Sequence, residues 1–193
     1  MKYLYNGKLF LNFNYINNWK NLWIKKVDYI SSFYYRNIEL FDNYIHDCFD
    51  YFIGLAECSI YLLNSIDVSN SIACISYIDY YNDDFCNPLN CKIDVAERNF
   101  SEYLRYLFYK DNYSYKSIFK LLYKYSNYYN YNLVLVRLIY PHVFFELLDC
   151  LYLKKSSGLV NIKDLIINTK KYEEFLHTLC LEMKKYQFIQ IDI

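Results

Sequence analysis

The chain has 193 residues, with 21 acidic and 21 basic side chains and therefore no net formal charge when histidine is neutral. A chain of this length can bury one sizeable core, and 55% apolar residues are more than a disordered segment carries. The balanced charge disfavours nucleic acid and anionic membrane as partners, because the molecule as a whole would not attract a polyanion. With 3 Gly and 2 Pro, the sequence lacks the turns of a many-stranded protein and favours a mainly α fold.

Long apolar runs are missing from the sequence. No stretch approaches the ~18 consecutive apolar residues of a membrane-spanning helix. The first residues also lack the continuous apolar run of a secretory signal. We therefore expect a cytoplasmic or peripheral protein without a transmembrane segment.

The seven cysteines are odd in number and scattered, which favours buried thiols over a disulfide framework. Cys86 and Cys91 lie close together, but no second pair follows at a suitable spacing, so a structural zinc site is not expected. The 26 tyrosines accompany abundant Asn, Ile and Lys, a composition typical of an AT-rich genome because these residues have AT-rich codons. Tyrosine richness is therefore weak evidence of function, and we expect core and half-buried tyrosines on helices.

Apolar residues recur at three- and four-residue steps from residue 15 to 35, which predicts an amphipathic helix. A second helix is expected from about residue 38 to 66, and it should be central because it is apolar around much of its circumference. Gly54 interrupts this helix at a cost of about 1 kcal/mol relative to Ala, which predicts a kink or the close approach of another helix. The apolar positions of the first helix are Ile16, Trp19, Trp23, Val27, Ile30 and Tyr34.

The pattern changes between residues 69 and 98, where two short segments, 72–75 and 91–94, are too short for helices and flank a polar loop. They predict two short strands. Helical spacing returns from Phe100 onward in three stretches, the last of which contains Pro141 and should kink or end near Tyr140.

We expect a final helix with Asn161 as its N-cap, and a tail over residues 188–191 that forms a strand or a packed extension. The prediction is thus a single domain of about six helices with a short β-hairpin near residues 72–94. Its parts are an irregular segment or strand remnant (1–13), a helical part (14–68), a strand-and-loop part (69–97) and a second helical part (98–185).

Five segments in this order resemble the C-terminal part of the bacterial spore-coat kinase-like proteins of the YutH and CotS type, relatives of the aminoglycoside phosphotransferases. The most recognisable is similar to the family's YYLGLAENAI-YL helix. Together the five cover roughly residues 19 to 180. They are Trp19–Asp28, Phe49–Leu62, Arg98–Arg105, Arg137–Glu146 and Tyr172–Leu176.

The resemblance implies a kinase-like C-terminal lobe without the N-terminal β-lobe, since about a dozen residues precede the first helix. Active relatives need a His-Gly-Asp-x-x-x-x-Asn segment that orients the acceptor hydroxyl and holds magnesium. The matching stretch, residues 72–82, contains no His-Gly-Asp, and Asp79 and Asn82 are weak candidates for displaced catalytic residues. Asp94 is the best candidate for the later magnesium-binding Asp, while Asn99 stands where the family has an Asp. His142, a lone histidine beside Phe144 and Phe145, is expected to be structural.

Three hypotheses remain open. The first is a non-catalytic, pseudokinase-like helical domain that binds a protein partner, as the resemblance implies in a spore-coat or envelope assembly, and needs no cofactor. The second is the C-terminal lobe of a small-molecule phosphotransferase that uses ATP and magnesium. It is either completed by a separately encoded N-terminal lobe or uses a rearranged site around Asp79, Asn82 and Asp94. The third is a helical adaptor whose likeness to the kinase lobe is accidental. The oligomeric state is left open.

Overall fold

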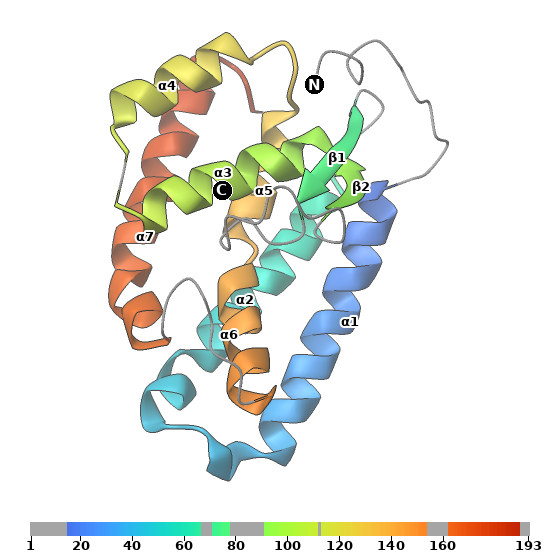
Figure 1. The fold of residues 1–193 in the computed structure, drawn as a ribbon, viewed down its shortest axis with the longest axis vertical. Coiled ribbons are helices and arrows are strands. Elements are labelled where there is room, and N and C mark those ends of the chain that lie inside the picture. Colours follow the sequence, from blue (N-terminus) through green and yellow to red (C-terminus); the bar gives the residue numbers. More distant parts are fainter. Residues whose placement is uncertain (1–14, 67–70, 78–90, 112, 154–161, 190–193) are drawn as a thin grey trace.

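The computed structural model describes residues 15–66, 71–77, 91–111, 113–153 and 162–189. These residues form seven α-helices and one two-stranded antiparallel sheet, so the prediction of a mainly α fold is confirmed (Figure 1). In chain order the elements are α1 (Tyr15–Arg36), the 3-10 helix η1 (Ile38–Leu40), α2 (Asn43–Leu63), β1 (Ala73–Tyr77), β2 (Cys91–Val95), α3 (Ala96–Tyr109), α4 (Tyr115–Lys124), α5 (Tyr131–Ile139), α6 (His142–Leu153) and α7 (Ile162–Lys185).

Helix α1 buries the stripe that its periodicity predicts and packs along α2 (Figure 1). The stripe continues into a stack of aromatic rings, because the Trp23 ring lies 4.0 Å from the ring of Tyr140 at the end of α5. Trp19 stacks on Trp23 at 5.6 Å. The buried residues of the stripe are Trp19, Trp23, Val27, Ile30 and Tyr34.

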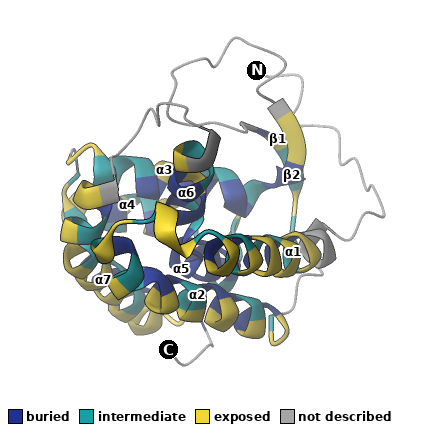
Figure 2. Cartoon of the chain, turned by 90° about the horizontal axis from the view of Figure 1, so that it is seen from below, coloured by how far each residue is buried: buried dark blue, intermediate teal, exposed yellow. Residues whose placement is uncertain are grey.

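The central helix is α5, and the prediction that the helix over 38–66 would be central is wrong. Every α5 residue except Asn132 is buried, since α2, α3 and α7 all pack around it. Helix α2 buries one face and leaves Tyr51 and Tyr61 exposed on the other. Figure 2 shows this arrangement, with buried residues facing inward and exposed residues on the outer sides of the surrounding helices.

Gly54 does not mark a close helix approach. A Cβ atom built on it would meet nothing within 4 Å, and α2 runs without interruption from Asn43 to Leu63. Gly54 is exposed, so the expectation of a close approach is wrong. The neighbouring apolar residues are buried on one face of α2, and Gly54 lies outside that face.

The predicted hairpin is present as β1 and β2, which pair antiparallel with Ala73 opposite Val95 and Tyr77 opposite Cys91. Its inner face carries Ser76 and Asp94, both buried. Strand β1 contacts α3, so the hairpin is held against the N-terminal half of that helix.

Pro141 ends a helix, as the sequence predicts. The stretch expected over residues 133–153 is two helices, α5 and α6, and Tyr140 between them has an extended ψ of 122°, the conformation that a following proline favours. This division explains why there are seven described α-helices instead of about six. The tail is a packed extension over its described part, since Ile189 is buried and Phe188 contacts the ring of Tyr131.

Asn161 and residues 190–193 lie outside the described residues, so the predicted N-cap and the end of the tail stay predictions. Among the described helices, none combines the length and the apolar character that crossing a bilayer requires.

Candidate functional site

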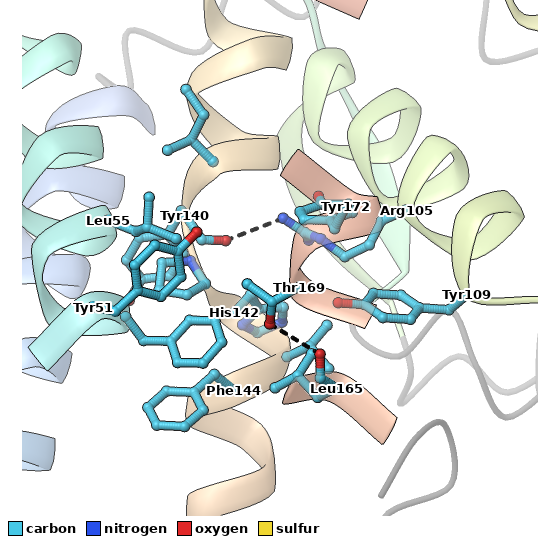
Figure 3. Close-up of a pocket in the computed structure, with 14 residues that line it drawn as sticks. Tyr51, Leu55, Arg105, Tyr109, Tyr140, His142, Phe144, Leu165, Thr169 and Tyr172 are labelled. Atoms are coloured by element: carbon cyan, nitrogen blue, oxygen red, sulfur yellow. Dashed lines mark hydrogen bonds between the residues drawn. The ribbon is translucent and has the colours of Figure 1, made fainter. Parts of the chain in front are cut away.

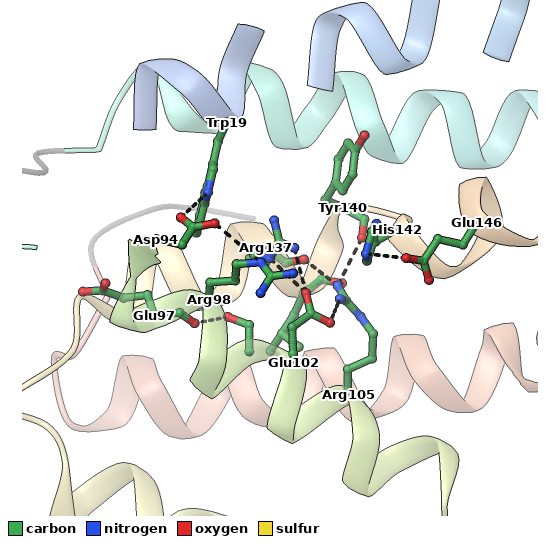
Figure 4. A network of polar contacts seen from close by, with 12 residues as sticks. Trp19, Asp94, Glu97, Arg98, Glu102, Arg105, Arg137, Tyr140, His142 and Glu146 are labelled. Atoms are coloured by element: carbon green, nitrogen blue, oxygen red, sulfur yellow. Dashed lines mark hydrogen bonds and ion pairs between the residues drawn. The ribbon is translucent and has the colours of Figure 1, made fainter. Parts of the chain in front are cut away.

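Buried charged side chains cluster around α3 in the described part of the chain and form a network of ion pairs and hydrogen bonds. Its side chains come from one face of that helix, where Arg98, Glu102 and Arg105 follow each other at helical spacing. Each is at most 3% exposed. Arg137 from α5 and Asp94 from β2 join them, and Figure 4 shows the network running from the hairpin toward the break between α5 and α6.

Asp94 lies at one end of this network, with both carboxylate oxygens engaged (Figure 4). Its Oδ1 accepts hydrogen bonds from the Trp19 indole N–H and the Val95 backbone N–H, each at 2.9 Å. Its Oδ2 lies 3.0 Å from Lys92 Nζ and 3.5 Å from Arg98 Nε. The side chain thereby joins α1, β2 and the start of α3, and a metal ion would have to displace Lys92 or Arg98 to reach Oδ2.

Glu102 is the centre of the network. Its Oε2 accepts a hydrogen bond from Arg105 Nη1 at 2.7 Å, and its Oε1 accepts from Arg137 Nε at 3.0 Å. Burial alone would raise the pKa of Glu102, but the guanidinium groups of Arg105 and Arg137 lower it well below its usual range. The carboxylate is therefore ionised at neutral pH and fully used by internal partners. Arg137 also lies over the Trp19 ring at 4.9 Å, a cation–π contact that links α5 to α1.

Arg105 closes the C-terminal end of α5. In a continuous helix the Arg137 carbonyl would accept from the backbone N–H of residue 141, but proline has no N–H. Arg105 Nη2 donates to this carbonyl at 2.6 Å and to the Tyr140 carbonyl at 3.2 Å. The Tyr172 hydroxyl from α7 donates to the Leu138 carbonyl at 2.9 Å. The guanidinium also places positive charge where the helix dipole is negative.

Two further polar side chains of α3 link this helix to α5 and to β1. Glu97 Oε1 accepts from the Asn130 backbone N–H at 3.0 Å, at the start of α5, and burial raises the pKa of this carboxyl. Asn99 Nδ2 donates to the Ile75 carbonyl at 3.0 Å and so ties β1 to the helix. The residue that stands in place of the family's Asp thus makes a contact with the hairpin.

A small cavity adjoins the network beside Arg105, between α2, α3, α7 and the α5–α6 junction (Figure 3). Its volume of about 30 Å³ is enough for about two water molecules and too small for a nucleotide. His142 lines it and lies 3.0 Å from Glu146 Oε1 within α6. The cavity can hold solvent beside the α5–α6 break.

The structure places the predicted site residues unevenly. Asp79 and Asn82 lie outside the described residues, so a site that joins them to Asp94 stays a prediction. Asp94 belongs to the charge network. Within the described ranges, no group of three or more His, Cys, Asp or Glu side chains is arranged to hold a metal ion.

The sequence reasoning missed the Glu102, Arg105 and Arg137 cluster. A signal for it was present, because Arg98, Glu102 and Arg105 recur at steps of four and three and share a face with Ser101 and Phe108. Charged residues at helical spacing on a helix's buried face predict internal ion pairs.

Comparison with known proteins matches the chain to the spore-coat family that its five sequence segments resemble. The family described as "Spore coat putative kinase YutH" matches residues 8–179. Endospore coat-associated protein YutH of Bacillus subtilis (strain 168) is 25% identical over 190 residues, covering 84% of this chain and 56% of that protein. The chain therefore spans little more than half the length of this relative. No solved structure matches significantly.

Proposed function

Because the chain belongs to the spore coat YutH family, we propose that it is a non-catalytic helical domain that works by protein association in the spore coat. The relative from Bacillus subtilis is named an endospore coat-associated protein, which supports the location. The observation that supports the absence of catalysis is the state of Asp94. A magnesium ligand needs carboxylate oxygens that face an open site, whereas Trp19, Lys92 and Arg98 occupy those of Asp94.

The proposal predicts that the purified protein gives no thermal shift with magnesium and ATP. A ligand at 1,000 times its Kd stabilises a folded protein by about 4 kcal/mol. For a domain of this size that corresponds to a rise in Tm of roughly 8 to 16 °C. Differential scanning fluorimetry with millimolar magnesium and ATP should leave Tm unchanged, and a rise of several degrees that also requires magnesium would contradict the proposal.

Association with the coat is tested separately. Coat extracts from spores of the source organism should contain the protein, detected with an antibody against the purified chain. Recovery of the protein from the decoated spore and the mother cell alone would contradict a coat function.

A second candidate is the C-terminal lobe of a phosphotransferase completed by a separate N-terminal lobe. The position of Asp94, at the end of a hairpin strand and directly before a helix, favours it. The test adds a glycine-rich β-lobe, if one is encoded nearby, and measures phosphoryl transfer. Asp94→Asn keeps an oxygen for Trp19 and Val95, so loss of transfer in a folded Asp94→Asn protein would favour the enzyme.

A further inference from the structure

A surface groove lies between α1 and α2, and none of the residues lining it belongs to the buried charge network. Its volume is about 340 Å³, within the range of pockets that hold a ligand or a large side chain. The two helices pack against each other (Figure 1). Val27 forms part of its apolar lining and is itself nearly buried.

The walls of the groove expose apolar side chains that the fold does not use. Ile24 on α1 is 38% exposed and Tyr61 on α2 is 75% exposed, and Ile60 lies between them and the core. Apolar side chains gathered around a hollow are typical of a surface that receives a side chain from a partner.

Each helix also contributes a carboxylate to the groove, Asp28 from α1 and Glu57 from α2. Among the described residues neither carboxylate forms an ion pair. Lys20 Nζ donates to Asn64 Oδ1 at 2.7 Å, at the C-terminal end of the helix that carries Glu57. Asp28 and Glu57 belong to the segments Trp19–Asp28 and Phe49–Leu62. Trp19 contacts the buried network, but no residue of Phe49–Leu62 belongs to it.

We propose that this groove binds a cationic amphipathic segment of another polypeptide, with one large apolar side chain between Ile24 and Tyr61 and lysine or arginine side chains on Asp28 and Glu57. Charge complementarity selects this occupant, because two carboxylates that form no ion pair within the described part of the chain lie beside an apolar hollow, where they repel an anionic segment and attract a cationic one. A second copy of the chain that paired groove to groove would place the same carboxylates opposite each other, which disfavours a symmetric dimer here. This inference rests on the proposed association function and names its surface.

The test uses two synthetic 14-residue amphipathic helices with leucine on one face and either lysine or glutamate on the other, each labelled with fluorescein. Fluorescence anisotropy with the full chain should give binding of the lysine peptide that weakens with salt, and at least tenfold weaker binding of the glutamate peptide. The double variant Asp28→Lys/Glu57→Lys should bind the lysine peptide at least tenfold more weakly than the unchanged protein. Tyr61→Ala should also weaken it.

The matched control is Glu39→Lys/Glu174→Lys, which makes the same charge change at two exposed positions away from the groove lining. Its affinity for the lysine peptide should stay within about twofold of that of the unchanged protein. Its free energy of unfolding should change little, as is usual for surface substitutions. Equal binding of both peptides, or an equal loss in the control variant, would overturn the proposal. All variants should keep the Tm of the unchanged protein.

Two other occupants have their own outcomes. If Lys2→Glu/Lys8→Glu in the full chain raises affinity for the lysine peptide tenfold, the groove is occupied by the chain's own first residues and the proposal is wrong. It is equally wrong if sedimentation shows a dimer that Asp28→Lys/Glu57→Lys abolishes. Coat extraction separates a failure of this proposal from a failure of the proposed function. If the protein is present in the coat but does not bind the lysine peptide, association with the coat stands and the groove is not its binding site.

Discussion

Glu102 is the buried carboxylate that two arginine side chains share. It is 2% exposed and each of its oxygens is held by a different arginine, Arg105 on its own helix and Arg137 on α5. A buried ion is costly unless its partners and hydrogen bonds are complete, and here loss of the Glu102 charge deprives two buried arginines, Arg105 and Arg137, of the carboxylate they share. The charge network therefore makes its members depend on one another.

We expect Glu102→Gln to lower the free energy of unfolding by about 3 to 5 kcal/mol, because the substitution breaks a buried ion pair while keeping the side-chain volume. Urea unfolding followed by far-UV circular dichroism measures this. Glu174→Gln on the exposed face of α7 is the control and should stay within about 0.5 kcal/mol of the unchanged protein. A cost for Glu102→Gln as small as that of the control would contradict the role of the network.

The same substitution has a pH signature. Folding lowers the pKa of Glu102 below its ordinary value of 4.5, so its stabilising contribution is complete above about pH 4.5 and is lost as the pH falls. The difference in stability between the unchanged protein and Glu102→Gln should thus shrink from pH 5 to pH 3. Folding raises the pKa of Glu97, so the difference measured for Glu97→Gln should change with pH in the opposite direction.

At the scale of elements, the position of the break between α5 and α6 was predictable from the sequence, but the side chain that stabilises the break was not. Pro141 predicts the end of a helix, because a missing N–H and a restricted preceding residue are properties of proline in any context. The group that satisfies the released carbonyls is Arg105, 36 residues away in the sequence, and no local rule points to it. Helix periodicity likewise predicted the buried face of α1, but could not tell α5 from α2 as the central helix. That choice depends on which helices pack around which.

Arg105 and Pro141 should differ sharply in their effect on stability. Arg105→Met keeps much of the apolar stem but removes the donor to Glu102 Oε2 and to the Arg137 carbonyl, while Arg137 still donates to Glu102 Oε1, so we expect a loss of about 3 to 5 kcal/mol. Pro141→Ala should cost about 1 kcal/mol or less, since it mainly frees the unfolded chain. Chemical denaturation of both variants checks this, and an equal loss for the two would argue against Arg105 as the group that closes α5.

Gly54 offers a stabilising change. Alanine at this position should raise the free energy of unfolding by about 1 kcal/mol, because the position is helical, exposed and free of neighbours within 4 Å of a new Cβ. Thermal and urea unfolding measure the gain. Ala56→Gly, two residues along the same helix but fully buried, is the matched control and should destabilise the protein.

At the scale of the whole molecule, one cluster of buried apolar residues draws on α1 to α7 and on β2. The resemblance in the sequence placed this chain in its family, and composition was enough to predict a mainly helical class. The way the five matching segments meet was not predictable from the sequence alone. Trp19, Asp94, Arg98 and Arg137 come from three of those segments and from β2, yet they meet in one network.

A shared core predicts cooperative unfolding. Differential scanning calorimetry should give one transition with a calorimetric enthalpy equal to the van't Hoff enthalpy, because α1, α3, α5 and the hairpin cannot separate without breaking the charge network. Two resolved transitions, with the first assigned to residues 15–66 by hydrogen exchange, would contradict this expectation.

The stacking of Trp19, Trp23 and Tyr140 has an optical consequence. Their ring centroids are 5.6 Å and 4.0 Å apart, close enough for the excited states of neighbouring rings to couple. Such coupling produces paired bands of opposite sign in the near-ultraviolet circular dichroism spectrum. These rings lie where α1, the hairpin and the α5–α6 break converge, and both tryptophans of the chain are among them. The stacked rings therefore provide an intrinsic spectroscopic signal, which should change when the packing at this junction rearranges and which needs no added label.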